Sequence, residues 1–330
     1  MLEFTDKGIF CSQADVYIDP WKPVKNAIIT HGHSDHARRG NGQYFCHQDT
    51  VPILNLRLGS DIEAKGMAYH QPFTRNGVEI SLHPAGHIIG SAQVRLAYKG
   101  EIWVVSGDYK LMKDGMSTPF EPVKCHHFIT ESTFGLPVYK FPPAAEVYQS
   151  INNWWEQNAT EGLNTILIAY ALGKSQSILS HLNESIGEIY LHGAVANVND
   201  ALGTAGYSFP GKRITPETEV KAIHGALILA PPSALSSPWI NKFKPFRKAV
   251  CSGWMQLRGT RRRFGVDRGF ILSDHCDWDQ LNQAVQASEA EKIYVTHGYQ
   301  STFVKWLHDR YQLDAMEIKT QFEPANEDLE

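Results

Sequence analysis

The chain has 330 residues, of which 42% are hydrophobic and 20% are charged, proportions close to those of an average globular protein. No window approaches eighteen apolar residues, which excludes a transmembrane helix, and the start, MLEFTDKGIF, lacks the features of a signal peptide. Five scattered cysteines, odd in number and never in a C-x-x-C pair, indicate reduced thiols and a cytoplasmic protein.

The charge is segregated along the chain, although the net charge is only −4. Residues 241–268 contain nine basic residues and one acidic residue, a net charge of +8. The last ten residues contain four acidic ones and are predicted to form an acidic tail over 321–330. These numbers argue against a protein whose whole surface is positively charged for binding nucleic acid. They allow a local, positively charged groove that binds a polyanion.

Short strands are predicted in the first third, where apolar or alternating runs stand between turn residues: 24–30, 78–83, 92–98 and 102–105. A helix is predicted over 51–58, capped by Asp49-Thr50 and ended by Gly59. From about residue 143 helices and buried strands alternate. The predicted helices are 144–158, 174–184 and 278–287, and the predicted strands are 165–169, 226–230, 248–251, 268–272 and 292–296.

The densest functional pattern is His31-Gly32-His33-Ser34-Asp35-His36, directly after the first buried strand. Positions i and i+2 of an extended segment point the same way, so His31 and His33 can hold one metal ion together. Asp35 and His36 follow where the chain turns and can face a second ion. Imidazole and carboxylate ligands without thiolate predict two catalytic divalent ions, zinc first and manganese as an alternative.

Two further ligand candidates follow other predicted strands. His87 lies in a glycine-containing turn after strand 78–83, and Asp108 follows strand 102–105, where its carboxylate could bridge both ions. His83 is predicted to be a neighbour of the site rather than a ligand, and His70 lies outside any ligand pattern.

This set of residues resembles the metallo-β-lactamase superfamily, which holds two metal ions with an H-x-H-x-D-H run, a later G-H and a G-D after an apolar strand. The resemblance implies an α/β fold, specifically an αββα sandwich. It also implies that Asp19, in Tyr17-Ile18-Asp19-Pro20, orients the ligands without binding the metal itself.

The position of the last ligand indicates a branch of this superfamily. The best candidate, His297, follows Asp108 by 189 residues. An insertion of that size is typical of the β-CASP nucleases, and Glu131 and His275 match the acidic and histidine motifs of that group. The predicted domains are 1–137 and 267–320 for the metallo-β-lactamase domain, 138–266 for an inserted α/β β-CASP domain, and 321–330 for the tail.

Within that group the chain resembles the bacterial ligase-associated DNA exonucleases, which are also described as mRNA 3′-end processing factors. The similarity covers almost the whole chain, including Ser106-Gly107-Asp108-Tyr109-Lys110 and His192-Gly193-Ala194. It implies a DNA repair exonuclease associated with an ATP-dependent DNA ligase and a helicase. Histidine at position 297 is associated with RNA cleavage among eukaryotic relatives, so an RNA-processing ribonuclease is the alternative.

Roles are predicted for each of these residues. His31, His33, His87 and Asp108 would hold one ion, whereas Asp35, His36, His297 and the shared Asp108 would hold the other. Asp35 is predicted to be a catalytic residue as well as a metal ligand. His275, oriented by Glu131, is the predicted general acid that protonates the leaving oxygen.

Contacts to nucleic acid are predicted from residues outside the metal cluster. Lys174 and Ser175 stand at a helix start, where backbone N–H groups could meet phosphate. The arginine run would line the approach of the backbone, with a solvated face as the alternative: Arg258, Arg261, Arg262 and Arg263.

Two alternative functions agree less well with these residues than a nuclease does. A small-molecule ester or thioester hydrolase would need neither an inserted domain nor a basic segment. A non-catalytic nucleic-acid-binding subunit would not need every ligand position filled. Both are therefore placed below the nuclease.

Overall fold

The computed structural model describes residues 1–320, apart from the side chains of Thr260 and Arg261, and the predicted acidic tail lies outside this range. The chain divides into two compact units. Among the described residues, unit 1 comprises Met1–Lys113, Ser117–Tyr139 and 275–320, and unit 2 comprises Asp114–Met116 and Lys140–Asp274. The domain boundaries inferred from the family resemblance, 137/138 and 266/267, stay predictions.

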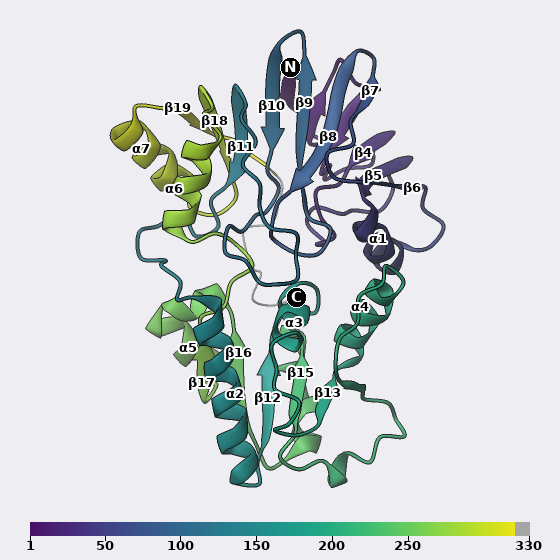
Figure 1. Cartoon of the computed structure of the whole chain (residues 1–330), viewed down its shortest axis with the longest axis vertical. Coiled ribbons are helices and arrows are strands. Elements are labelled where there is room, and N and C mark those ends of the chain that lie inside the picture. Colours follow the sequence, from purple (N-terminus) through teal and green to yellow (C-terminus); the bar gives the residue numbers. More distant parts are fainter. Residues whose placement is uncertain (321–330) are drawn as a thin grey trace. The chain divides into compact units, whose positions relative to one another are not determined.

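Unit 1 contains two sheets (Figure 1). The first has six strands in the order of the chain: β1 (Leu2–Phe4), β2 (Ile9–Cys11), β3 (Val16–Ile18), β4 (Asn26–Ile28), β5 (Gln43–His47) and β6 (Ala64–Met67). The second has seven strands, which are, from edge to edge, β19 (Asp314–Glu317), β18 (Lys292–Thr296), β11 (His127–Glu131), β10 (Glu101–Val105), β9 (Ala92–Tyr98), β8 (Val78–Pro84) and β7 (Phe73–Arg75).

The two sheets of unit 1 are packed face to face between helices. Ile28 and Val105 point into the core shared by both sheets. Because side chains alternate along a strand, Ile29 points instead toward α1 (Val51–Leu58), and Val104 points toward α6 (Trp278–Ala287) and α7 (Gln300–Tyr311). Both faces of these strands are buried, which explains their unbroken apolar sequences. The predicted αββα sandwich is confirmed.

Unit 2 is built around a parallel sheet of six strands. Their order is β14 (Lys212–Arg213), β13 (Ile189–Leu191), β15 (Leu227–Ala230), β12 (Asn164–Ile168), β16 (Phe246–Cys251) and β17 (Arg268–Phe270). One face packs on α2 (Ala144–Thr160), α3 (Lys174–Leu179) and α4 (Gly193–Gly203). Short 3-10 segments cover the other face, among them Pro238–Phe243 and Gly253–Gln256.

The predicted elements are found close to their expected places, with one clear exception. The helix expected over 174–184 ends at Leu179, because the Ser180 hydroxyl donates a hydrogen bond to the Gln176 carbonyl oxygen (3.0 Å) where the chain turns away. The five cysteines are free and buried. No helix within residues 1–320 is long and apolar enough to span a membrane.

Candidate metal centre

The predicted ligand residues all lie in unit 1, at the ends of strands or in the loops that follow them. The loops after β4, β8, β10 and β18 carry seven of them: His31, His33, Asp35, His36, His87, Asp108 and His297. Glu131 is the last residue of β11, and His275 precedes α6. The fold therefore brings residues from distant parts of the sequence to one end of the sandwich.

The first group consists of His31, His33, His87 and Asp108, which offer ligand atoms within 4.8 Å of one another. Nε2 of His31 lies 3.3 Å from Oδ2 of Asp108. Nδ1 of His33 lies 3.1 Å from Nε2 of His87. Two imidazole nitrogens this close need a proton or a cation between them. The group therefore has the geometry of a cation site.

The second group consists of Asp35, His36 and His297. The rings of His36 and His297 are stacked with their centroids 5.3 Å apart, and Nε2 of His36 lies 3.5 Å from Oδ2 of Asp35. The same nitrogen lies 3.4 Å from Oδ2 of Asp108, which belongs to the first group. The carboxylate of Asp108 thus stands between the two groups, where it was predicted to bridge two ions.

Threonines fix which nitrogen of two ligand histidines faces the cluster. The Thr30 hydroxyl donates to Asp19 (2.6 Å), so it accepts from Nδ1 of His31 (3.1 Å). The Thr296 hydroxyl donates to a main-chain carbonyl oxygen of β11 (3.2 Å), so it accepts from Nδ1 of His297 (2.9 Å). In both histidines the proton is held on Nδ1, and Nε2 carries the lone pair that a metal needs.

Asp19, which is predicted to orient the ligands, lies against the loop that carries His31 and His36. Its carboxylate accepts from the Thr30 backbone N–H (2.8 Å) and from Nδ1 of His36 (2.7 Å), as well as from the Thr30 hydroxyl. Asp19 is buried, and its backbone φ of 43° is in the left-handed region that non-glycine residues seldom adopt. The buried carboxylate binds Thr30 and His36, and the backbone that carries it is strained. Both features are typical of a residue that supports metal ligands.

The electrostatics of the cluster depend on Asp108. Burial would raise the pKa of its carboxyl group, but the neighbouring imidazoles of His36 and His31 lower that pKa well below its usual range. Burial opposes the charged form of His36, yet Asp108, Asp35 and Asp19 raise its pKa well above the usual range. Burial lowers the pKa of His33, His87 and His297, which leaves these imidazoles neutral. Anionic Asp108 and neutral His33, His87 and His297 are in the forms that bind metal, whereas a bound ion would displace the proton of His36.

A divalent ion also fits the hydrogen-bonding balance of the cluster. Nε2 of His31 and Oδ1 of Asp108 are buried and make no hydrogen bond to any residue among 1–320. Such atoms cost about 1–3 kcal/mol each when nothing compensates them. A cation at the centre of the group would compensate both.

Glu131 and His275 form a buried pair beside the first group. Nδ1 of His275 lies 2.9 Å and 3.0 Å from the two carboxylate oxygens of Glu131, and the ring of His275 lies 4.7 Å from that of His87. Glu131 also accepts from the backbone N–H groups of Tyr109 (3.1 Å) and Thr133 (3.3 Å). The carboxylate is thus fixed from several sides, and it fixes the ring of His275 in turn.

The turn that presents His297 requires glycine at the next position. His297 has a φ of 52° and Gly298 a φ of 64°. A Cβ on Gly298 would lie 2.2 Å from the carbonyl oxygen of Ser132 and 2.5 Å from Cα of Thr133. The strand end of β18 therefore approaches the chain after β11 so closely that only glycine fits.

The residues predicted to bind phosphate lie in unit 2. Lys174 is buried, with Nζ 3.5 Å from Asp274, and Ser175 is buried with both its hydroxyl and its N–H directed at the Tyr170 carbonyl oxygen. Arg258, Arg262 and Arg263 are exposed on α5 (Arg258–Phe264), whereas the side chain of Arg261 lies outside the described residues. Their role in nucleic-acid binding stays a prediction.

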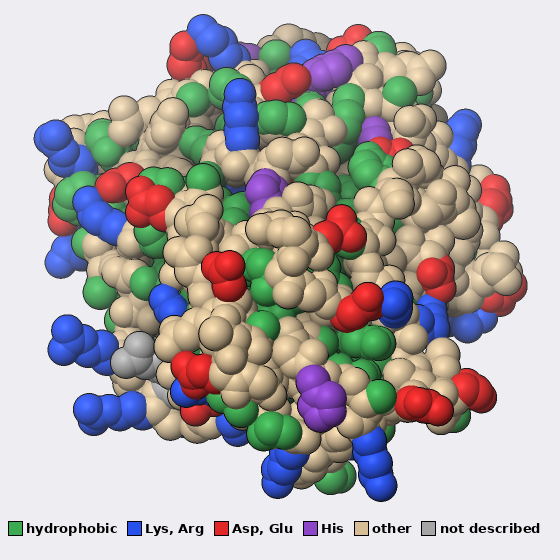
Figure 2. All heavy atoms as spheres, turned by 60° about the horizontal axis from the view of Figure 1, so that its bottom comes forward, with side chains coloured by type: hydrophobic (Ala, Val, Ile, Leu, Met, Phe, Trp, Pro, Cys, Tyr) green, Lys and Arg blue, Asp and Glu red, His purple; other side chains and the backbone are tan. Residues whose placement is uncertain are grey.

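Some basic side chains of residues 241–268 contact other residues of unit 2. Arg247 pairs with Glu161 (2.7 Å), and the Arg268 side chain donates to Ser150 (2.8 Å) and lies over the ring of Phe270. On the face presented by Figure 2, Lys and Arg side chains are interspersed with Asp and Glu side chains. Glu161 therefore offsets one of the nine positive charges of residues 241–268.

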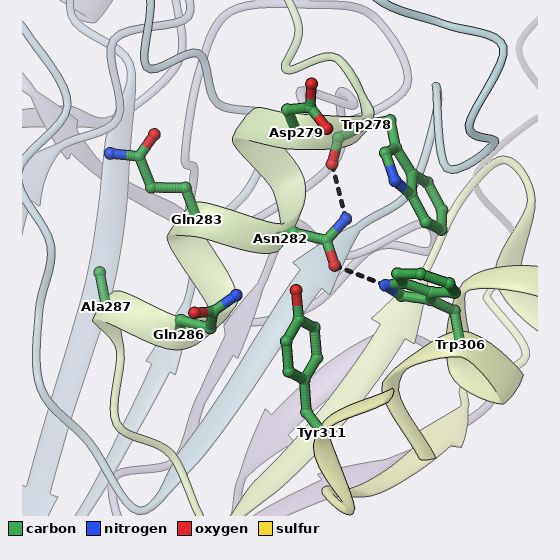
Figure 3. A pocket seen from close by; sticks show the side chains of 8 residues that line it. All are labelled: Trp278, Asp279, Asn282, Gln283, Gln286, Ala287, Trp306 and Tyr311. Carbon is green, nitrogen blue, oxygen red and sulfur yellow. Dashed lines mark hydrogen bonds between the residues drawn. The ribbon is translucent and has the colours of Figure 1, made fainter. Parts of the chain in front are cut away.

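A surface pocket of about 700 Å³ lies between α6 and α7, away from the ligand residues (Figure 3). Trp278, Trp306 and Tyr311 line it together with amide side chains. Asn282 joins the two helices there, because it donates to the Trp278 carbonyl oxygen (2.7 Å) and accepts from the indole N–H of Trp306 (2.7 Å). None of the predicted site residues lines this pocket.

Thr30 and Thr296 are functional neighbours that the sequence analysis did not identify. Each directly precedes a ligand histidine, in Thr30-His31 and Thr296-His297, at a strand end. The repeated Thr-His pair is the signal that could have identified them, because a threonine hydroxyl can reach Nδ1 of the following histidine.

No family model matches the chain. A probable DNA ligase of Opitutus terrae is 30% identical over 310 residues, which cover 92% of this chain and 30% of that protein. Cleavage and polyadenylation specificity factor subunit 3 of Dictyostelium discoideum is 29% identical over 193 residues (48% of this chain, 24% of that protein). Endoribonuclease YSH1 of Saccharomyces cerevisiae is 27% identical over 118 residues (35% and 15%).

The chain spans less than a third of the length of these curated relatives. Among solved structures, a protein of unknown function from Enterococcus faecalis V583 superimposes with a TM-score of 0.59 and 13% identity, over 89% of this chain and 79% of that one. At this identity the likeness shows a shared fold.

Proposed function

Since the chain belongs to the metallo-β-lactamase β-CASP family, we propose that it is a metal-dependent nuclease that hydrolyses phosphodiester bonds. The observation that carries this proposal is the position of the Glu131–His275 pair beside two ligand groups that share Asp108. Phosphodiester hydrolysis needs an activated water, charge neutralisation and a proton for the leaving oxygen, and this arrangement offers residues for all three.

We propose that the first group and the second group each hold one ion, with zinc the best fit to neutral imidazoles and carboxylates. Two such ions, when bound, supply an activated water and neutralise phosphate charge. The chain keeps the ligand atoms in place through Asp19, Thr30 and Thr296. Manganese is the alternative metal.

His275 is the proposed general acid. Its Nδ1 donates to Glu131, so its Nε2 is the nitrogen that can give a proton to the departing sugar oxygen. Glu131 is the proposed positioning residue, because its carboxylate fixes the ring and stabilises the charged imidazole.

DNA is the proposed substrate, cleaved from an end during repair. The relative named a probable DNA ligase aligns over 92% of this chain, whereas the relatives named endoribonucleases align over 35–51%. RNA is the second candidate, since histidine at position 297 is the RNA-type residue of the resemblance and several relatives are named endoribonucleases. We also propose a cytoplasmic role with an ATP-dependent DNA ligase and a helicase.

The test uses end-labelled single-stranded DNA, duplex DNA and RNA of one sequence, with added zinc or manganese. A ladder of products shortened from one end on DNA would support an exonuclease, and internal cuts on RNA would favour the alternative. Asp108→Asn, purified in the same way, excludes a contaminating nuclease. Absence of cleavage of all three substrates with either metal would overturn the proposal.

A further inference from the structure

A second cluster of metal-ligating side chains lies in unit 1, outside the groups described above. One ring nitrogen each of His70 and His83 and one carboxylate oxygen of Glu121 lie within 4.8 Å of one another. Nε2 of His70 is 3.2 Å from the carboxylate of Glu121, and the rings of His70 and His83 meet edge to face with centroids 5.0 Å apart. We propose that these three residues bind a further divalent transition-metal ion, of the zinc class, apart from the catalytic pair.

The backbone holds the three residues together without any ion. The His70 N–H donates to the Leu82 carbonyl oxygen (2.8 Å), beside His83 in β8. The Glu121 N–H donates to the Pro84 carbonyl oxygen (3.3 Å), and its own carbonyl accepts from the Gln93 side chain (2.7 Å). The backbones of His70 and Glu121 are therefore both anchored to the end of β8, so little ordering is needed when an ion binds.

His70 is held in an unusual conformation that serves this arrangement. Its φ of 61° lies in the left-handed region, which non-glycine residues seldom adopt. The turn directs the imidazole toward Glu121 and His83. This turn thus places the imidazole of His70 beside groups of ligand type from two other segments of the chain.

The protonation state of His83 also suits a metal. Burial, together with the neighbouring His70 and Arg95, lowers the pKa of His83 to about 4, so its imidazole is neutral at neutral pH. The Ser81 hydroxyl lies 3.0 Å from Nε2 of His83 and steadies the ring. Arg95 is neutralised by Glu79 (2.7 Å), which reduces its repulsion of a cation.

The cluster is open to solvent, unlike the buried catalytic groups. The side chains of His70 and Glu121 are 52% and 50% exposed. Two imidazoles and one carboxylate leave further coordination positions for water, as in zinc sites with three protein ligands. An ion can therefore enter directly from solution.

Occupancy of this site would stabilise the turn that carries His87. The chain just before Glu121 packs on that turn, where the Ser117 hydroxyl donates to the Gly86 carbonyl oxygen (3.0 Å). A Cβ on Gly86 would lie 2.9 Å from the backbone nitrogen of Phe120. An ion that fixes Glu121 would hold this segment against the turn.

The experiment measures zinc bound per protein, after dialysis against buffered free zinc, for wild type, His70→Ala and Glu121→Ala. The affinity of both variants for zinc at this site should fall by more than about tenfold. At a free zinc concentration that just fills the site in wild type, both variants should therefore bind one equivalent less. His224→Ala, which removes an exposed histidine of unit 2, should bind as wild type. Asp108→Asn should lose zinc from the catalytic groups and keep this equivalent, so the two sites are distinguishable.

Hydrogen exchange gives a second measurement, with zinc as the probe. Zinc should slow amide exchange over residues 117–121 in wild type and not in Glu121→Ala, whose folding without metal is checked by circular dichroism. Equal zinc content in wild type and both variants would overturn the proposal and leave His70–Glu121 as a simple ion pair. Unchanged exchange on zinc addition would also count against it.

Discussion

The candidate metal centre of unit 1 and helix α5 of unit 2 are both dense in charged or ionisable residues, but they hold them differently. In the metal centre, His31, His36 and Asp108 are buried and fixed by hydrogen bonds or close ion pairs. On α5, Arg258, Arg262 and Arg263 are exposed, and their side chains form no hydrogen bond or ion pair with another described residue. Buried charge without function would be costly, whereas exposed charge costs little.

This contrast determines what each region can be expected to do. A buried, preorganised group binds at fixed geometry, so one substitution should remove its function. An exposed arginine run contributes a screened, distributed attraction, so each residue should matter little. Substitutions at the metal centre should therefore have larger effects than substitutions on α5.

The largest effect is expected for Asp108→Asn. The variant loses the charge that stands between both ligand groups, so kcat/KM for nucleic acid should fall by at least about 10³-fold. The measurement is initial rate on end-labelled substrate, with circular dichroism to confirm the fold. Asp309→Asn, an exposed acid on α7, should keep wild-type activity. Comparable rates for wild type and Asp108→Asn would refute the site.

His275→Ala should be the next in size, with a loss of about 10²–10⁴-fold in kcat on natural substrate. A general acid matters less when the leaving group is already a good one, so a p-nitrophenyl phosphodiester should be hydrolysed with a much smaller defect. Asp108→Asn should be equally impaired on both substrates. Equal defects of His275→Ala on the two substrates would show that His275 does not protonate the leaving group.

Asp19→Asn should weaken metal binding without abolishing it. The amide nitrogen would face donors that now meet a carboxylate, the Thr30 hydroxyl and Nδ1 of His36. Loss of such a support typically costs about 10–100-fold in metal affinity. Competition with a chromogenic chelator measures this, and Asp6→Asn, an exposed acid paired with Lys22, is the matched control. Activity of Asp19→Asn should recover at high zinc, and a failure to recover would assign Asp19 a different role.

The strands and ligands of the metal centre could be predicted because each leaves a local pattern. β9 and β18 coincide with apolar or alternating runs of the sequence, and each ligand follows such a run. The strands of the N-terminal hairpin, β1 and β2, were not predicted, because three residues are too few to show a period. The order of strands in each sheet likewise depends on contacts between distant segments.

The cluster of His70, His83 and Glu121 shows where sequence patterns stop being informative. Its members come from a turn, a strand and a loop, and no spacing relates them. Backbone hydrogen bonds to Leu82 and Pro84 bring them together, and these depend on the folded sheet. Position 298 likewise could not be understood from the sequence alone. It requires glycine because the carbonyl oxygen of Ser132, in the loop after β11, lies too close for a Cβ.

The smallest effect is expected at α5. Replacing Arg258, Arg262 and Arg263 by alanine removes three exposed positive charges, so binding of DNA should weaken and depend less steeply on salt. Each lost phosphate contact lowers the slope of log K against log salt by about 0.9. Fluorescence anisotropy at several salt concentrations measures the slope, with Asp108→Asn as background to prevent cleavage.

The matched control for α5 replaces Lys65, Lys99 and Lys305, three exposed lysines of unit 1, by alanine. It changes the net charge by the same amount, so a general charge effect would lower binding equally in both triple variants. A lower slope for the arginine variant alone would locate phosphate contacts on α5. An unchanged slope would show that the arginines form a solvated face, and the contrast with the metal centre would then be one between a site and a surface.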